Sequence, residues 1–176
     1  MPSSLDLRRI EELGLNSSAP PGQLLYDGWL LRLLPGQAKR ARSVNAVYPS
    51  TRQLAEKVPY CERIYRSHKL PVIFRITPFS EPAGLDAELE RRGYPKFDQT
   101  MVEDGWAGLF DIVTDKALRR QGYGQQLIHG LLQAAWELGA RHAYLQVTAD
   151  NTPARTLYAR LGFTQRYQYW YRGHPE

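Results

Sequence analysis

The sequence of 176 residues predicts an α/β fold, in which one continuous mixed sheet is flanked by helices and built from two half-domain repeats. Stripes of apolar residues at helical spacing alternate with short runs of β-forming residues along the chain. The segment VIFRIT…LDAELERRGYPKFDQ matches AYLQVT…ARTLYARLGFTQRYQ, strand for strand and helix for helix. Such self-similarity indicates an internal duplication. The alternative is that the two strand-helix-strand segments are alike only because such units look alike in any α/β protein.

The first half is expected to contain a helix, two strands, a helix, a strand, a helix and a last strand. Apolar residues at Leu54, Val58, Cys61 and Tyr65 have the spacing of one helix face. The expected elements span residues 5–13, 24–34, 43–48, 51–68, 72–77, 85–92 and 97–102. We expect the last strand to end the first copy and to begin the second, so that the copies span residues 1–100 and 101–176 and share one sheet.

The second half has the clearer periodicity. Apolar residues between Gly122 and Gly139 form the stripe of a long amphipathic helix, and Gly139 ends it. A second helix over residues 152–161 begins at Asn151 or Thr152, both of which are good helix caps. Strands are expected over residues 106–114, 142–148 and 163–171. The Asp-Gly step at residues 104–105 predicts a hairpin between strands 97–102 and 106–114.

Composition limits the classes of protein. The chain has 23 Lys and Arg against 18 Asp and Glu, with a pI near 9.4, so an anionic partner such as nucleic acid or a phosphorylated cofactor is plausible, as is an ordinary solvated surface. Cys61 is the only cysteine, which excludes an intrachain disulfide and favours the cytoplasm. No apolar run is long enough to cross a membrane. The four histidines lack metal-binding spacing, so we expect no metal.

The most specific motif is a pair of glycines, Gly122 and Gly124, between a strand and the start of the long helix. Glycines let the backbone approach an anion closely, and the N–H groups of a first helical turn point toward it. Arg119 and Arg120 add positive charge beside them. The motif is neither a dinucleotide fingerprint, since Leu127 stands at the third glycine position, nor a Walker loop.

The second half resembles the GNAT superfamily of acyl-CoA N-acyltransferases over residues 106–171. That family carries a Q/R-x-x-G-x-G/A loop, which Arg119, Gly122 and Gly124 match. It also carries an Asn, a helical Tyr and a Gly-Phe pair, matched by Asn151, Tyr158, Gly162 and Phe163. The resemblance implies a mostly antiparallel, twisted sheet flanked by helices, and acetyl-CoA as co-substrate.

The resemblance also implies roles for particular residues. The implied cofactor-binding residues are Ile112, Val113, Thr114, Arg119, Arg120, Gln121, Gly122, Tyr123, Gly124, Gln125, Asn151 and Tyr158. A backbone N–H of the strand at residues 112–114 would stabilise the thioester oxygen. Asn151 would hydrogen-bond the pantetheine, and Tyr158 would donate a proton to the leaving sulfur. The alternative for Tyr158 is a half-buried aromatic residue with a purely structural role.

The general base is less well defined. Asp111 is the first candidate, because it lies in the strand expected to hold the thioester. Strand alternation places it on the face opposite Ile112 and Thr114, so a structural role is equally open. Glu103 and Asp104 are acidic neighbours that fit a turn better than a catalytic site.

The chain departs from the family pattern in two ways. The helix pair that usually shapes the acceptor site is missing before strand 106–114, and the first half must substitute for it. The first half also lacks a glycine loop and has Leu89 where the second has Tyr158, so it is expected to be a degenerate copy without a cofactor.

The expected function is an N-acetyltransferase in which an amine attacks acetyl-CoA directly. The alternatives are a non-catalytic acyl-CoA-binding protein or inactive relic and, with weaker support from the KRARS run at residues 39–43, a nucleic-acid-binding module. The acceptor, a peptide or small-molecule amine, is not identified by any residue. A homodimer through an exposed aromatic strand at residues 167–171 is a further expectation from the resemblance.

Overall fold

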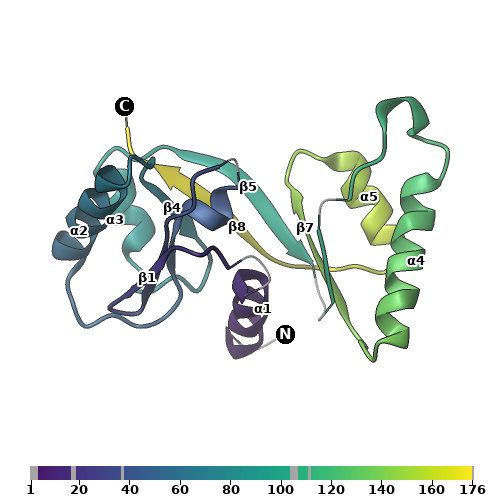
Figure 1. The fold of residues 1–176 in the computed structure, drawn as a ribbon, viewed down its shortest axis with the longest axis horizontal. Coiled ribbons are helices and arrows are strands. Elements are labelled where there is room, and N and C mark those ends of the chain that lie inside the picture. Colours follow the sequence, from purple (N-terminus) through teal and green to yellow (C-terminus); the bar gives the residue numbers. More distant parts are fainter. Residues whose placement is uncertain (1–3, 17–18, 37, 104–106, 111, 176) are drawn as a thin grey trace. The chain divides into compact units, whose positions relative to one another are not determined.

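The computed structural model describes residues 4–16, 19–36, 38–103, 107–110 and 112–175 (Figure 1). The chain folds into two compact units: unit 1 comprises Met1–Gln99 and Gln168–Glu176, and unit 2 comprises Thr100–Tyr167. Within the described residues, the strands follow the order β1-β2-β3-β4-β8-β5-β7-β6 and pair mostly antiparallel, with five α-helices flanking them. The expected mixed α/β class is confirmed.

Unit 1 contains three helices and the first four strands. Its elements are α1 (Ser4–Asn16), β1 (Gln23–Tyr26), β2 (Trp29–Arg32), β3 (Val44–Ala46), α2 (Leu54–Ser67), β4 (Ile73–Ile76), α3 (Leu85–Arg91), the first part of β5 (Lys96–Glu103) and the last part of β8 (Gln165–Gly173). β3 and β4 are parallel, and β4 pairs antiparallel with β8. A 3₁₀ turn (Lys39–Arg42) precedes β3.

Strand alternation gives unit 1 two differently packed faces. Phe74 of β4 lies in an apolar core with Tyr65 of α2 and Leu89 of α3, all fully buried. The next residue, Arg75, points to the other face, where it pairs with Glu11 of α1. Helices α2 and α3 therefore cover one face of β4, and α1 covers the other, as Figure 1 shows.

One predicted strand is a hairpin. The sequence predicted a single strand over residues 24–34, but the structure has β1 and β2 joined by Asp27 and Gly28, with Tyr26 opposite Trp29. Asp27 has φ 44° and Gly28 has φ 82°, the positive angles that two-residue hairpin turns need. The residues on both sides of this turn are apolar, which is why the sequence predicted one continuous strand.

Unit 2 is built around β7. Its elements are the last part of β5, β6 (Ala107–Leu109), a 3₁₀ turn (Lys116–Leu118), α4 (Tyr123–Glu137), β7 (Ala143–Thr148), α5 (Thr152–Arg160) and the start of β8. Ile128 of α4, Leu145 of β7 and Tyr158 of α5 meet in its core. α4 and α5 lie on the same side of β7 (Figure 1), so the starts of the two helices can line one cavity.

The hairpin predicted between strands 97–102 and 106–114 is wrong within the described residues. β5 pairs antiparallel with β7, and β6 pairs parallel with β7, so β7 lies between them. β7 contributes Tyr144, Leu145 and Val147 to the buried residues, which explains its central position. β6 ends at Leu109, well before residue 114, and its pairing with β7 ends there at Leu145. Residues 104 and 105 lie outside the described residues.

The expected aromatic strand is not an exposed edge. Tyr169 and Tyr171 are buried in β8, at 3% and 5% exposure, and β8 pairs with β4 through Tyr171 and Arg75. Arg75 also stacks on the Tyr169 ring at 3.6 Å. The strand therefore cannot offer those side chains to a second subunit, so its expected exposure is wrong, whereas the homodimer itself stays a prediction.

Candidate active site

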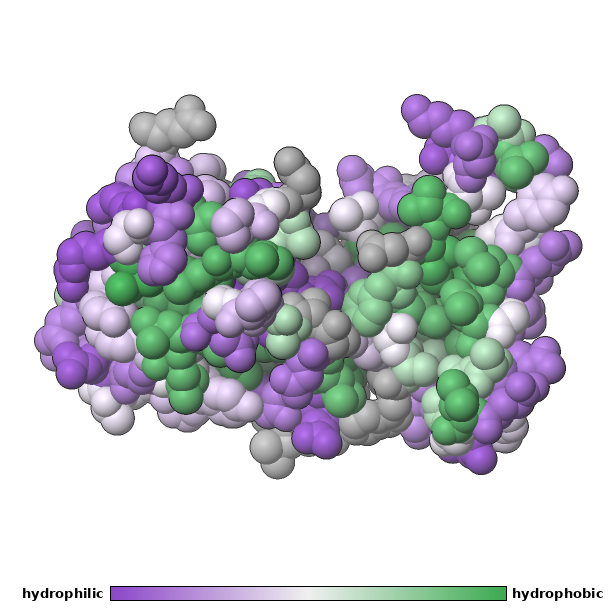
Figure 2. All heavy atoms as spheres, in the orientation of Figure 1, coloured by the Kyte–Doolittle hydropathy of each residue, from purple (hydrophilic) through white to green (hydrophobic). Residues whose placement is uncertain are grey.

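A cavity of about 720 Å³ opens in unit 2 beside the starts of α4 and α5. Its volume lies within the roughly 300–1,000 Å³ range of small-molecule sites. Its walls come from the segment after β6, the loop before α4, the first turns of α4, and α5. Apolar surface gathers over α5 and the adjacent side of α4 (Figure 2), as expected where part of a ligand is apolar.

Eleven of the residues predicted to bind the cofactor line this cavity. They are Ile112, Val113, Thr114, Arg119, Arg120, Gly122, Tyr123, Gly124, Gln125, Asn151 and Tyr158. Gln121 does not line it, and its side chain donates instead to the Ala117 carbonyl at 3.3 Å. Asp111 and Asp104 lie outside the described residues, and Glu103 ends β5. The structure thus groups the predicted binding residues and leaves the general base a prediction.

Gly122 and Gly124 are needed for different reasons. Gly122 begins α4 with φ 86°, a left-handed conformation that costs other residues about 1–2 kcal/mol. Gly124 is the second residue of α4: a Cβ there would sit 3.4 Å from Thr114 Oγ1 and 3.6 Å from Leu157 Cδ2, two residues that line the cavity. Gly122 therefore provides the left-handed backbone conformation at the start of α4. Gly124 leaves space between the first turn of α4 and the side chains of Thr114 and Leu157.

The cavity wall is positively charged. Arg119, Arg120 and Arg160 line it, and none of its described lining residues is acidic. The Nε of Arg119 also donates to the Thr114 carbonyl at 3.3 Å, which ties the loop to the end of the preceding segment. Together with the start of α4, whose dipole is positive at that end, these arginines favour a polyanion.

The segment at residues 112–114 alternates as an extended chain does. Ile112 packs against the core of unit 2, whereas Val113 is 75% exposed. The pairing of β6 with β7 ends at Leu109 and Leu145, so this segment lines the cavity rather than continuing the ladder. The strand expected over this stretch is therefore a loop that still lines the predicted site.

Asn151 caps the start of α5, and Tyr158 lies within that helix. The Oδ1 of Asn151 accepts a hydrogen bond from the Ala154 N–H at 3.3 Å and so caps the helix, while its Nδ2 carries the donor hydrogens that a pantetheine carbonyl would require. Tyr158 is only 8% exposed, and its ring meets that of Phe163 edge to face at 6.1 Å between centroids. This packing holds the phenol at a fixed position in the cavity wall.

Sequence reasoning missed part of the wall. The additional lining residues are Leu118, Ile128, Pro153, Ala154, Leu157 and Arg160. The helical spacing of Ala154 and Leu157 with Tyr158 is a signal that could have placed both residues in the site. Arg160 carries no comparable signal, because an arginine near the end of a helix is equally common on a solvated surface.

A glycine-bearing helix start, a cationic wall and a buried phenol thus come together in one cavity of unit 2. Residues 90–163 match the family described as "Acetyltransferase (GNAT) family". The uncharacterized N-acetyltransferase YobR of Bacillus subtilis is 38% identical over 95% of this chain and 98% of its own length. That alignment spans 247 positions, more than the 176 residues of this chain, so it includes positions at which this chain has a gap. The chain belongs to the GNAT family.

Other relatives agree with this assignment. The [ribosomal protein bS18]-alanine N-acetyltransferase of Escherichia coli K12 is 37% identical over 46% of this chain and 55% of its own length. A GCN5-related N-acetyltransferase from Kribbella flavida has the same fold, with a TM-score of 0.68 and 14% identity, covering 100% of this chain and 97% of its own. By its family, the protein is an acyltransferase that transfers an acetyl group to an amine.

Within the described residues, no helix is long and apolar enough to span a membrane. The same residues contain no group of three or more His, Cys, Asp or Glu side chains placed to hold a metal ion.

Proposed function

We propose that acetyl-CoA binds in the cavity between the starts of α4 and α5 and that an amine attacks its thioester directly. The observation that carries this proposal is the start of α4, where Gly122 and Gly124 expose the first helical turn to a cavity lined by three arginines. The first-turn N–H groups would hold the pyrophosphate. The apolar wall at Ile112, Ala154 and Leu157 suits the pantetheine arm.

The chain's own residues then divide the work of the transfer. Acetyl-CoA supplies the reactive thioester carbonyl. Tyr158, fixed by its contact with Phe163, would donate a proton to the sulfur as the carbon–sulfur bond breaks and the new carbon–nitrogen bond forms. A backbone N–H at residues 112–114 would stabilise the thioester oxygen. The amine must also lose a proton, and Asp111 remains our proposed base for that step.

We propose that unit 1 contains a degenerate copy, because its equivalent anion position is already filled. The carboxylate of Asp27 accepts hydrogen bonds from the Thr51 and Arg52 N–H groups, each at 3.0 Å, just before α2. Lys57, fully buried in the first turns of α2, pairs with the same carboxylate at 3.0 Å. An internal carboxylate thus takes the place that we assign to the cofactor phosphates at α4.

The ends of α3 and α5 are compatible with a duplication, although α4 also ends this way at Gly139. α3 ends at Gly93 with φ 82° and α5 at Gly162 with φ 89°. The Tyr94 N–H bonds to the Leu89 carbonyl at 3.0 Å, and the Phe163 N–H bonds to the Tyr158 carbonyl at 3.1 Å, so the two caps are alike. In both copies a helix also joins two parallel strands, β3 to β4 and β6 to β7.

The last strands of the two copies are exchanged between the units. β5 follows α3 but pairs with β7 in unit 2, and β8 follows α5 but pairs with β4 in unit 1. We therefore propose that the first copy spans residues 1–100 and the second spans residues 101–176. The two compact units divide the chain differently, because each contains the last strand of the other copy.

Turnover with an amine panel tests the function. Thiol release from acetyl-CoA is measured for the wild type and for Tyr158→Phe, with affinity measured by calorimetry. We expect turnover to fall about 10²–10⁴-fold in the variant while acetyl-CoA affinity stays within a few-fold. Tight binding without turnover on any peptide or small-molecule amine would instead support the acyl-CoA-binding relic.

The alternative function, a nucleic-acid-binding module, has little structural support. Lys39 is in an ion pair with Asp98 and lies over the Phe97 ring, and Ala41 of the same 3₁₀ turn is buried. The KRARS run is thus packed into unit 1 instead of forming a free basic stripe. We propose a cytoplasmic location, supported by the single cysteine, Cys61, which forms no intrachain disulfide.

A further inference from the structure

One exposed side of α4 carries an apolar stripe made of three leucines. Leu127, Leu131 and Leu138 are 45%, 40% and 90% exposed, and their helical spacing places them on one side of the helix. None of the three lines the cofactor cavity. The outer face of a surface helix is normally charged, but Glu137 is the only acidic or basic residue among the 15 residues of α4. The α4 stripe thus has the composition of a contact surface.

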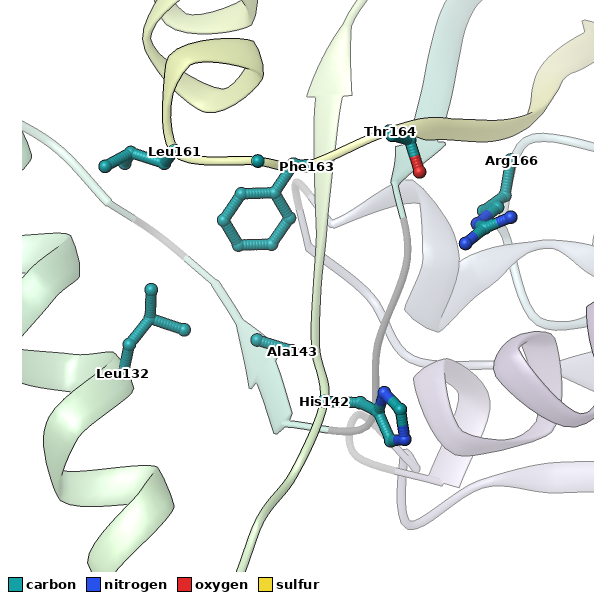
Figure 3. A pocket seen from close by; sticks show the side chains of 8 residues that line it. Leu132, His142, Ala143, Leu161, Phe163, Thr164 and Arg166 are labelled. Atoms are coloured by element: carbon teal, nitrogen blue, oxygen red, sulfur yellow. The ribbon is translucent and has the colours of Figure 1, made fainter.

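The α4 stripe lies on the side of the helix that faces away from α5. Ile128 is buried in the core of unit 2, and Leu132 points toward Leu161 and Phe163 in the segment that ends α5 (Figure 3). At 3.6 residues per turn, the stripe leucines lie about 100–140° around the helix from Leu132. α5 leads to β8, and the strand order places β8 and β6 on opposite sides of β7. The stripe is therefore on the β6 side of unit 2.

β6 presents an open backbone edge on that same side. It is the last strand in the order of the sheet, and within the described residues its one partner is β7. The Ala107 N–H bonds to the His142 carbonyl at 2.7 Å, so Ala107 directs its backbone groups toward β7. Successive residues of a strand direct these groups to opposite sides, so the N–H and C=O of exposed Gly108 point away from β7. Such an edge favours pairing with another strand.

We propose that the α4 stripe and the Gly108 edge form one self-association surface, through which two copies of this chain make a symmetric dimer. Two Gly108 residues that face each other across a two-fold axis exchange both hydrogen bonds, because each N–H meets the other copy's C=O. An axis perpendicular to the paired strands keeps both α4 helices on the same face of the joined sheet. The two stripes then pack against each other, antiparallel, beside the strand pair.

The charge of the surface favours a second copy over other partners. In a two-fold contact the same surface meets itself, so a surface with net charge would repel its counterpart, whereas the α4 stripe is neutral. An amphipathic helix that binds an anionic membrane carries Lys or Arg, and α4 contains neither. A helix of 15 residues is about 22 Å long and about 10–12 Å wide, so the contact is smaller than the roughly 800 Å² per partner of a standard interface. The dimer is therefore weak and depends on concentration.

Sedimentation equilibrium of the full chain between about 1 µM and 1 mM tests the dimer. We expect a dissociation constant of about 10–100 µM, as befits a small interface. Leu138→Lys should weaken the dimer at least about tenfold, because it removes apolar contact and places like charges across the axis. The fold does not depend on Leu138, which is 90% exposed. Gln133→Lys is the matched control: it adds the same charge at an exposed position of α4 outside the stripe and should leave the constant unchanged.

Hydrogen exchange tests the strand pairing separately. Residue-level mass spectrometry at about 1 µM and 1 mM should show the Gly108 N–H exchanging more slowly at the higher concentration, and Leu138→Lys should reduce that difference. A chain that stays monomeric up to 1 mM, equal weakening by Leu138→Lys and Gln133→Lys, or Gly108 exchange independent of concentration would each overturn the proposal. A monomer that cosediments with phosphatidylcholine vesicles would overturn it in favour of a membrane surface. These measurements need no acetyl-CoA, so they stand or fall separately from the proposed function.

Discussion

Replacing Gly124 with aspartate tests the proposed cofactor position most directly. The new Cβ has ordinary contacts with Thr114 and Leu157, so the fold can accept it, and a carboxylate near the start of α4 interacts favourably with the helix dipole. The same carboxylate would face the phosphates. Unit charges about 4 Å apart repel by about 1 kcal/mol in water and about 4 kcal/mol at an effective dielectric of 20. Two phosphate charges then cost at least about 2 kcal/mol, or roughly a 30-fold loss of affinity.

The assay is calorimetric titration with acetyl-CoA, beside urea unfolding of each protein. Gly130→Asp is the matched control: Gly130 is also in α4, has open space around it and does not line the cavity. We expect Gly124→Asp to lose at least about 30-fold in affinity and to unfold at the same or higher urea concentration, and Gly130→Asp to bind as the wild type does. Equal acetyl-CoA affinity in wild type and Gly124→Asp would refute the phosphate position, and an equal loss in both variants would refute its specificity.

Three further results are expected. Gly122→Ala should lower the free energy of unfolding by about 1–2 kcal/mol in urea titrations, because φ is 86° and no atom lies within 4 Å of the new methyl group. Arg160→Gln should weaken acetyl-CoA about fivefold, increasingly at low salt, while Arg155→Gln, outside the lining, binds normally in the same titration. The Thr51 and Arg52 N–H groups and Lys57 hold the pKa of Asp27 well below its usual range, so its carboxylate stabilises the fold above about pH 4 and this contribution is lost as the pH falls below that. Thermal melts of Asp27→Asn should therefore show a lower midpoint than wild type at pH 7 and a smaller difference at pH 3.

The Asp-Gly signal shows where local sequence was sufficient and where it was not. The dipeptide at residues 27–28 does form a hairpin turn, with both residues at positive φ. The dipeptide at residues 104–105 was expected to do the same, yet the strands on either side of it pair with β7 and not with each other. A turn propensity is local, whereas the choice of a strand's partner depends on which strand buries the most apolar surface. β7 contributes three buried residues and takes both partners.

The cavity was predicted better than the sheet for a related reason. Gly122, Gly124 and Asn151 act through backbone conformation within one loop or one helix turn, which their spacing in the sequence already determines. The aromatic strand failed because Tyr169 and Tyr171 alternate as any strand does, and only the pairing with β4 decides that they are buried. Arg160 lines the cavity because of how α5 packs in unit 2, and the sequence around Arg160 does not predict that packing.

The two units differ in what lies beside the start of the helix that follows a strand: a carboxylate of the chain itself at α2, and a cavity at α4. In both units a helix follows a strand, and the helix begins after a loop. In unit 1 the hairpin turn brings the Asp27 carboxylate to the Thr51 and Arg52 N–H groups, and buried Lys57 balances its charge while stacking on Trp29 at 4.0 Å. Neither α2 nor α4 has a side-chain cap at its own N-cap residue; the difference in unit 2 is that arginines, and no acidic residue among the described lining residues, line the space beside α4. In unit 1 the positive charge of Lys57 is paired with the Asp27 carboxylate of the chain itself. The arginines beside α4 have no acidic residue among the described lining residues, so they favour an anion from solution. For this reason we propose that acetyl-CoA binds to unit 2 alone.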